Sequence, residues 1–173
     1  MKLTADEAIV RLEVPGRPAP QGSKKGFARG GKVAMVEMSR HVKPWREDVR
    51  TAAEKWIADH PGLYPIQGAL SVDMVFSIAR PKGHFGTGRN AGVLKPSAPA
   101  YPTGAPDLSK LARSTEDAIT SAGLWSDDSR VVHYGRLEKQ YVIGPDDASP
   151  LFDPYVMRVP GAVIVIRTLE VAW

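Results

Sequence analysis

Apolar side chains recur at helical spacing between residues 107 and 123. The repeating positions are Leu108, Leu111, Ala112, Thr115 and Ile119. Their spacing of i, i+3, i+4, i+7 and i+11 predicts a helix with one buried face. Asp107 follows Pro106 at the expected N-cap, and Gly123 stands just past the expected helix end. Four polar residues fall off the apolar stripe and are predicted to face solvent or a substrate: Lys110, Arg113, Ser114 and Asp117.

The rest of the chain shows several strand patterns and one further helix. Strands are predicted over residues 8–14, 69–79, 130–142 and 162–170, with a hairpin near 25–28 and 33–37. Residues 69–79 alternate strictly between apolar and other side chains, which predicts a half-buried strand. The clearest helix covers residues 44–59, with Pro44 at its first position and Trp45 and Trp56 in the core. This order predicts an α+β fold, a mixed β-sheet with two main helices packed on it.

The chain length and the absence of an internal repeat favour a single domain over residues 1–173. Residues 82–105 are rich in Gly, Pro, Ala and Ser with scattered positive charge, which predicts a flexible basic loop. Residues 144–161 form an irregular excursion rich in Pro and Asp. Both segments are expected to lie outside the regular elements.

Composition excludes several classes of protein. The chain has no cysteine, so disulfides, zinc–thiolate sites and thiol nucleophiles are ruled out. The four histidines lack the spacing of metal ligands. No apolar run reaches membrane length, and the N-terminus shows no signal-peptide pattern. We therefore expect an intracellular, cytoplasmic protein with no membrane partner.

The distribution of charge is more informative than the net charge of +4. No acid stands in residues 15–36 or 74–106, whereas acids concentrate in residues 107–128 and 146–153. Basic segments around an acidic centre suit a nuclease, because Lys and Arg bind phosphates and carboxylates hold a metal ion. The candidate DNA-binding residues are Lys24, Lys25, Arg29, Lys82, Lys110 and Lys139. The alternative is that these cations only solvate glycine-rich loops.

Two aspartates stand at the two ends of the predicted helix. Asp107 precedes the helix, and Asp128 lies in the predicted turn Ser126–Ser129 before the next strand. If the helix start and this turn lie close in space, the two carboxylates converge, and like charges gather readily only around a cation. The alternative is that Asp107 is an ordinary helix cap and Asp128 an ordinary turn residue.

The segment from residue 107 to residue 128 resembles the signature of the RusA family of Holliday-junction resolvases. The matching residues are Asp107-Leu108, Lys110-Leu111, Arg113, Asp117-Ala118-Ile119, Gly123, Trp125 and Asp127-Asp128. The resemblance implies a RusA-like fold and a small homodimeric endonuclease that uses Mg²⁺ to nick four-way DNA junctions symmetrically. Independently of this resemblance, a loop as long as residues 82–105 is either disordered or functional, and because it leads straight into Asp107 we predict a mobile flap that contacts DNA.

The resemblance implies roles for individual residues as well. The family's metal-binding acids fall on Asp107 and Asp128, and its catalytic lysine falls on Arg113, which keeps the charge but does not donate a proton in practice. A third acid of the family falls on Ser109, which has no carboxylate, so Mn²⁺ is expected to substitute well for Mg²⁺. Asp127, as a further metal ligand, and Asp117 are the candidates to supply the missing acid.

The functional hypothesis is a Mg²⁺-dependent, structure-specific endodeoxyribonuclease that resolves Holliday junctions in recombination and repair, encoded by a cell, a phage or a prophage. One alternative, motivated by Ser109, is a branched-DNA-binding protein with weak or no cleavage activity. Another alternative is a structural or interaction module that binds no nucleic acid, in which the basic loops are incidental.

Overall fold

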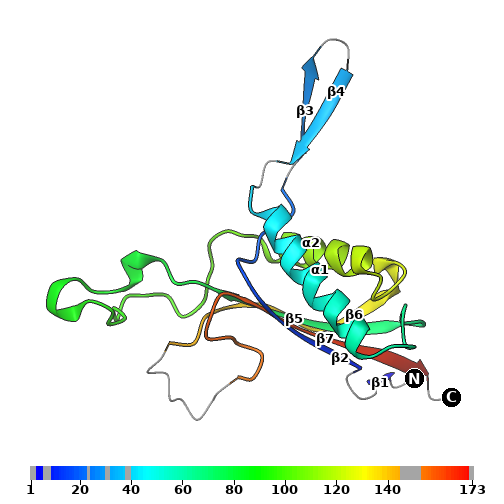
Figure 1. The fold of residues 1–173 in the computed structure, drawn as a ribbon. Helices are drawn as coiled ribbons and strands as arrows, with labels where there is room; N and C mark the ends of the chain where they lie inside the picture. Colours follow the sequence, from blue (N-terminus) through cyan, green and yellow to red (C-terminus); the bar gives the residue numbers. More distant parts are fainter. Residues whose placement is uncertain are drawn as a thin grey trace.

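The fold is a β-sheet with two helices packed on one face (Figure 1). The computed structural model describes residues 3–5, 9–22, 24–29, 32–37, 40–144 and 153–171. The sheet contains β1 (Leu3–Ala5), β2 (Val10–Pro15), β5 (Leu70–Ile78), β6 (Val131–Tyr141) and β7 (Gly161–Val171). Strand β7 lies at the centre and pairs antiparallel with β1, β2 and β5, while β5 pairs parallel with β6. The predicted α+β fold with a mixed sheet is therefore confirmed.

The helices are α1 (Val42–Asp59) and α2 (Leu108–Ala122), and they pack against each other over the sheet. Helix α1 begins two residues before the predicted start at Pro44. Trp45 is fully buried, donates a hydrogen bond from Nε1 to Thr115 Oγ1 at 3.1 Å and meets Phe76 edge-on. Trp56 is partly buried, packs against the core from its edge and stacks on His60, so it contacts the core as predicted without being fully buried.

Strand β5 is buried on both faces, which corrects the prediction of a half-buried strand. The helices cover one face. The segment after residue 152 covers the other, where Tyr155 donates a hydrogen bond to Asp73 and the Met157 amide donates one to Ser77 Oγ. Sequence periodicity did not reveal this second layer because Ser71, Asp73 and Ser77 are polar although buried.

Ser114 corrects the predicted limits of the apolar stripe on α2. The side chain is fully buried rather than facing solvent, and its hydroxyl donates to the Ala19 carbonyl at 2.6 Å. The Gln21 amide also donates to the Lys110 carbonyl at 3.1 Å. These bonds hold the segment after β2 against the start of α2.

Two parts of the chain extend beyond the sheet and helices (Figure 1). The predicted hairpin is present as β3 (Lys24–Arg29) and β4 (Lys32–Glu37), paired antiparallel. Residues 82–105, predicted as a flexible basic loop, form a mostly exposed arm with two short 3₁₀ turns, Lys82–His84 and Gly88–Asn90. Isolated bridges between Phe85 and Leu94 and between Gly86 and Ala91 shape this arm. Of the predicted excursion over 144–161, residues 145–152 lie outside the described part.

Candidate active site

The carboxylate of Asp107 stands exposed at the start of α2. Its backbone occupies the N-cap position in an extended conformation, as predicted, but its side chain accepts no capping hydrogen bond. It instead forms an ion pair with Lys110 at 3.1 Å. Because both side chains are more than half exposed, this pair holds the carboxylate only weakly. The Asp107 carboxylate is therefore able to bind a cation or to contact a substrate.

Lys139 holds the residues that directly precede Asp107. Its Nζ donates to the carbonyl oxygens of Gly104 at 2.6 Å and Pro106 at 2.9 Å. These bonds join the C-terminal end of β6 to the residues directly before α2. The predicted phosphate contact of Lys139 is untested, and the structure gives this ammonium a positioning role beside Asp107.

A second group of acids lies toward the other end of β6, around Asp128. The Tyr134 hydroxyl donates a hydrogen bond to Glu116 on α2, and the charge of Asp128 acts on both groups. Burial raises the pKa of the Glu116 carboxyl above its usual value, while the hydrogen bond from Tyr134 works in the opposite direction. Arg113 is exposed and its positive charge also acts on Glu116. The sequence analysis did not identify Glu116 as a candidate. The one feature of the sequence that points to it is its position three residues after Arg113, which places both side chains on the same side of α2.

Asp117 and Asp127, the predicted substitute ligands, are engaged elsewhere. Asp117 forms an ion pair with Arg46 and so ties α2 to α1. Asp127 accepts a hydrogen bond from the Ser129 amide at 2.8 Å, which lowers the pKa of its carboxyl and caps the short 3₁₀ turn Asp128–Arg130. Ser109 is exposed in the first turn of α2. Asp117 and Asp127 therefore each make a structural contact, and their roles as metal ligands stay predictions.

Asp107 and Asp128 do not converge within one chain, contrary to the spatial hypothesis drawn from the sequence. The charge of Asp128 acts on Glu116, which lies nine residues after Asp107, and nine residues of an α-helix span about 13 Å. Asp107 precedes helix α2 and lies near the end of β6, whereas Asp128 follows the helix and precedes β6. Among the residues that the structure describes, no three His, Asp or Glu side chains gather in a group able to hold a metal ion.

The predicted DNA-binding cations are spread over several elements. Lys110 and Lys82 are exposed, at the start of α2 and at the base of the arm. Lys24, Lys25 and Arg29 belong to β3, which projects away from the sheet with its hairpin partner (Figure 1). The side chains of these three residues lie outside the described set. Their contacts with phosphate remain predictions.

Exposed carboxylates at the edge of an α+β domain with projecting basic segments are typical of a nuclease. The family model described as "Endodeoxyribonuclease RusA" matches residues 15–143, which include Asp107, Arg113 and Asp128. The chain belongs to this family, and the resemblance seen in the sequence is confirmed. It is accordingly an endodeoxyribonuclease of a family that resolves Holliday junctions.

No curated protein matches the chain. In the described residues, no helix is both long and apolar enough to cross a membrane.

Proposed function

We propose that the chain acts as a homodimer that cuts four-way DNA junctions with the help of a divalent metal ion, in recombination and repair. The observation that carries this proposal is the placement of two exposed carboxylates, Asp107 and Asp128, at opposite ends of the pair formed by α2 and β6. A single chain keeps these two carboxylates apart. A second copy of the chain would supply the missing carboxylate at each end of this pair.

Strand β6 offers an edge for such a second copy. Within the described residues it pairs only with β5, so its other edge is open. Val132 is 62% exposed and Tyr134 is 38% exposed on this strand, and exposed apolar side chains beside an open edge favour association. Two β6 strands that pair edge to edge about a twofold axis run antiparallel. The start of one β6 then lies beside the end of the other.

This pairing would bring Asp107 of one chain toward Asp128 of its partner, once at each end of the dimer. A divalent metal ion bound there would polarise the scissile phosphate and lower the pKa of an attacking water. Arg113 would donate hydrogen bonds to phosphate oxygens as negative charge builds on them. Two sites related by a twofold axis suit a junction with two equivalent strands to cut.

The first test replaces Asp128 with Asn. We expect Asp128→Asn to lower Mg²⁺-dependent junction cleavage by at least about 100-fold, because a charged metal ligand is lost. Binding of a labelled four-way junction should persist or tighten, since a negative charge near the phosphates disappears. The matched control is Asp59→Asn, which removes an exposed carboxylate that pairs with Lys55 on α1. Cleavage by Asp128→Asn at the parental rate would disprove the assignment.

Ser109 tests the composition of the metal site. The residue lies two positions after Asp107 and is exposed, so a carboxylate there would reach the same ion. We expect Ser109→Asp to lower the Mg²⁺ concentration for half-maximal cleavage about tenfold.

Glu116→Gln should raise this Mg²⁺ concentration if the Glu116 carboxylate beside Asp128 serves the same ion. Titrations that do not move in either variant would remove both positions from the metal site.

A branched-DNA-binding protein with little cleavage is the second candidate, and Ser109 is the observation that favours it. It predicts selective junction binding over linear duplex with no Mg²⁺- or Mn²⁺-dependent product. The same binding and cleavage assay on the unaltered protein separates the two candidates.

A further inference from the structure

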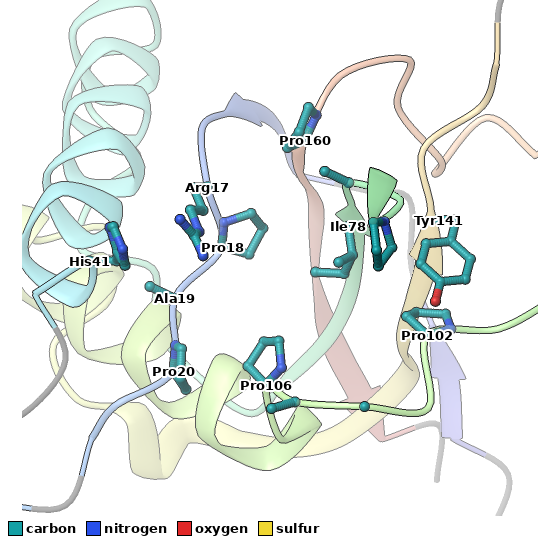
Figure 2. Close-up of a pocket in the computed structure, with 14 residues that line it drawn as sticks. Arg17, Pro18, Ala19, Pro20, His41, Ile78, Pro102, Pro106, Tyr141 and Pro160 are labelled. Atoms are coloured by element: carbon teal, nitrogen blue, oxygen red, sulfur yellow. The ribbon is translucent and has the colours of Figure 1, made fainter. Parts of the chain in front are cut away.

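A cavity of about 630 Å³ lies directly before Asp107 (Figure 2). It is open to solvent on one side and is lined by the segment after β2, the ends of β5 and β6, and the residues that lead into α2. Much of its wall is apolar, with the saturated rings of Pro18, Pro102 and Pro106 and the aromatic ring of Tyr141. A cavity of this size matches those that bind small organic groups.

The walls are held in place by contacts outside the cavity. The guanidinium of Arg80 lies 4.1 Å from the centre of the Tyr141 ring, and His84 meets the same ring edge-on. Lys139 fixes the wall at Gly104 and Pro106 through its two hydrogen bonds. The cavity is therefore formed before any ligand arrives, which reduces the entropy lost on binding.

One side of the cavity is positively charged. Figure 2 shows Arg17 and His41 across the cavity from Tyr141. Arg40, the residue before His41, donates a hydrogen bond from Nε to His41 Nε2 at 3.2 Å, and burial together with the charges of Arg17 and Arg40 lowers the pKa of His41. The positive charge here therefore comes from the two arginines. No lining residue is acidic, and in the part of the chain that the structure describes Arg17 forms no ion pair. This cationic corner, formed by Arg17, Arg40 and His41, attracts an anion such as phosphate.

We propose that this cavity binds one unpaired nucleotide of the DNA next to the cleavage point, with its base between the proline rings and Tyr141 and its phosphate at Arg17 and His41. The proposal rests on the proposed function and names the substrate feature that the site reads. The aromatic ring of Tyr141 accepts any base by stacking, the proline rings pack against the other side of the base, and the cationic corner accepts the backbone. Because Pro106 directly precedes Asp107, a nucleotide held here lies beside the carboxylate proposed to act on the scissile phosphate.

The test uses four-way junctions with 2-aminopurine, a base whose fluorescence rises when it leaves the stack, at successive positions around the crossover. The full chain is added without divalent metal so that the junction stays intact. We expect fluorescence to rise several-fold at one position adjacent to the nick that Mg²⁺ later produces. Tyr141→Ala should abolish this rise and weaken junction binding about tenfold, because a stacking surface is lost.

Matched variants distinguish the cavity from general damage. Tyr141→Phe keeps the ring and should keep the fluorescence rise. Leu63→Ala removes an apolar side chain that is 65% exposed after α1 and does not line the cavity, so it should behave as the unaltered protein. Arg17→Gln should reduce the dependence of log affinity on log salt by about one unit of slope. Linear-duplex binding checks that each variant is folded.

The outcomes separate this proposal from the function on which it rests. If the unaltered protein neither binds nor cuts junctions, both are wrong. If it binds and cuts but the fluorescence of no labelled base rises, or Tyr141→Ala behaves like Leu63→Ala, then only the nucleotide cavity is overturned.

Discussion

A dimer of one Asp107→Asn chain and one Asp128→Asn chain is expected to nick junctions, although each variant alone is inactive. In the proposed dimer, each site takes Asp107 from one chain and Asp128 from its partner. The mixed dimer therefore loses both carboxylates at one site and keeps both at the other. We expect about half of the unaltered nicking rate, against losses of at least about 100-fold for each variant alone.

The measurement uses mixed dimers isolated through two different affinity tags and a supercoiled plasmid that extrudes a four-way junction. One intact site should release nicked circles without the linear product that requires two cuts. The converse dimer joins an unaltered chain to a chain with both substitutions. Its two sites should each lack one carboxylate and be inactive. Activity in this converse dimer, and none in the first, would place each complete site within one chain.

The outline of the fold follows from local pattern. The apolar stripe and Gly123 gave the limits of α2, and Gly123 has the left-handed φ of 79° that favours glycine at a helix end. Strict alternation located β5 to within one residue at each end. These features depend on neighbours in the sequence, so the sequence alone contains them.

The arrangement of the site does not follow from local pattern. The number of residues between Asp107 and Asp128 would allow the chain to turn back to the start of α2 after the helix ends. Only the placement of β6 along α2 shows that Asp128 does not reach the start of the helix. Glu116 becomes a candidate only because Tyr134 and Asp128 lie beside it. Similarly, the ion pair that occupies Asp117 depends on Arg46 from another helix. Each of these contacts joins residues from different elements.

Asp73 illustrates the same limit on the far face of the sheet. Alternation assigns it to the polar side of a half-buried strand, yet only 5% of the residue is exposed. Its carboxylate accepts hydrogen bonds from Arg167 at 2.7 Å, from the Tyr155 hydroxyl at 3.1 Å and from the Arg136 amide at 2.9 Å. A Cβ added at Gly135 would lie 2.4 Å from this carboxylate, so β6 passes close to it. The carboxylate therefore connects β5, β6, β7 and the segment that covers them.

Asp73→Ala is consequently expected to lower the free energy of unfolding by about 3–5 kcal/mol, because it leaves the mostly buried Arg167 guanidinium without its partner. Urea denaturation followed by circular dichroism measures the change. Asp59→Ala, which breaks an exposed ion pair with Lys55, should cost less than about 1 kcal/mol. Asp73 lies on the face away from α2, so cleavage per folded molecule should stay within about twofold of the unaltered protein at a temperature where both are folded. A small loss of stability, or a selective loss of cleavage in a stable variant, would show that this carboxylate serves the reaction rather than the sheet.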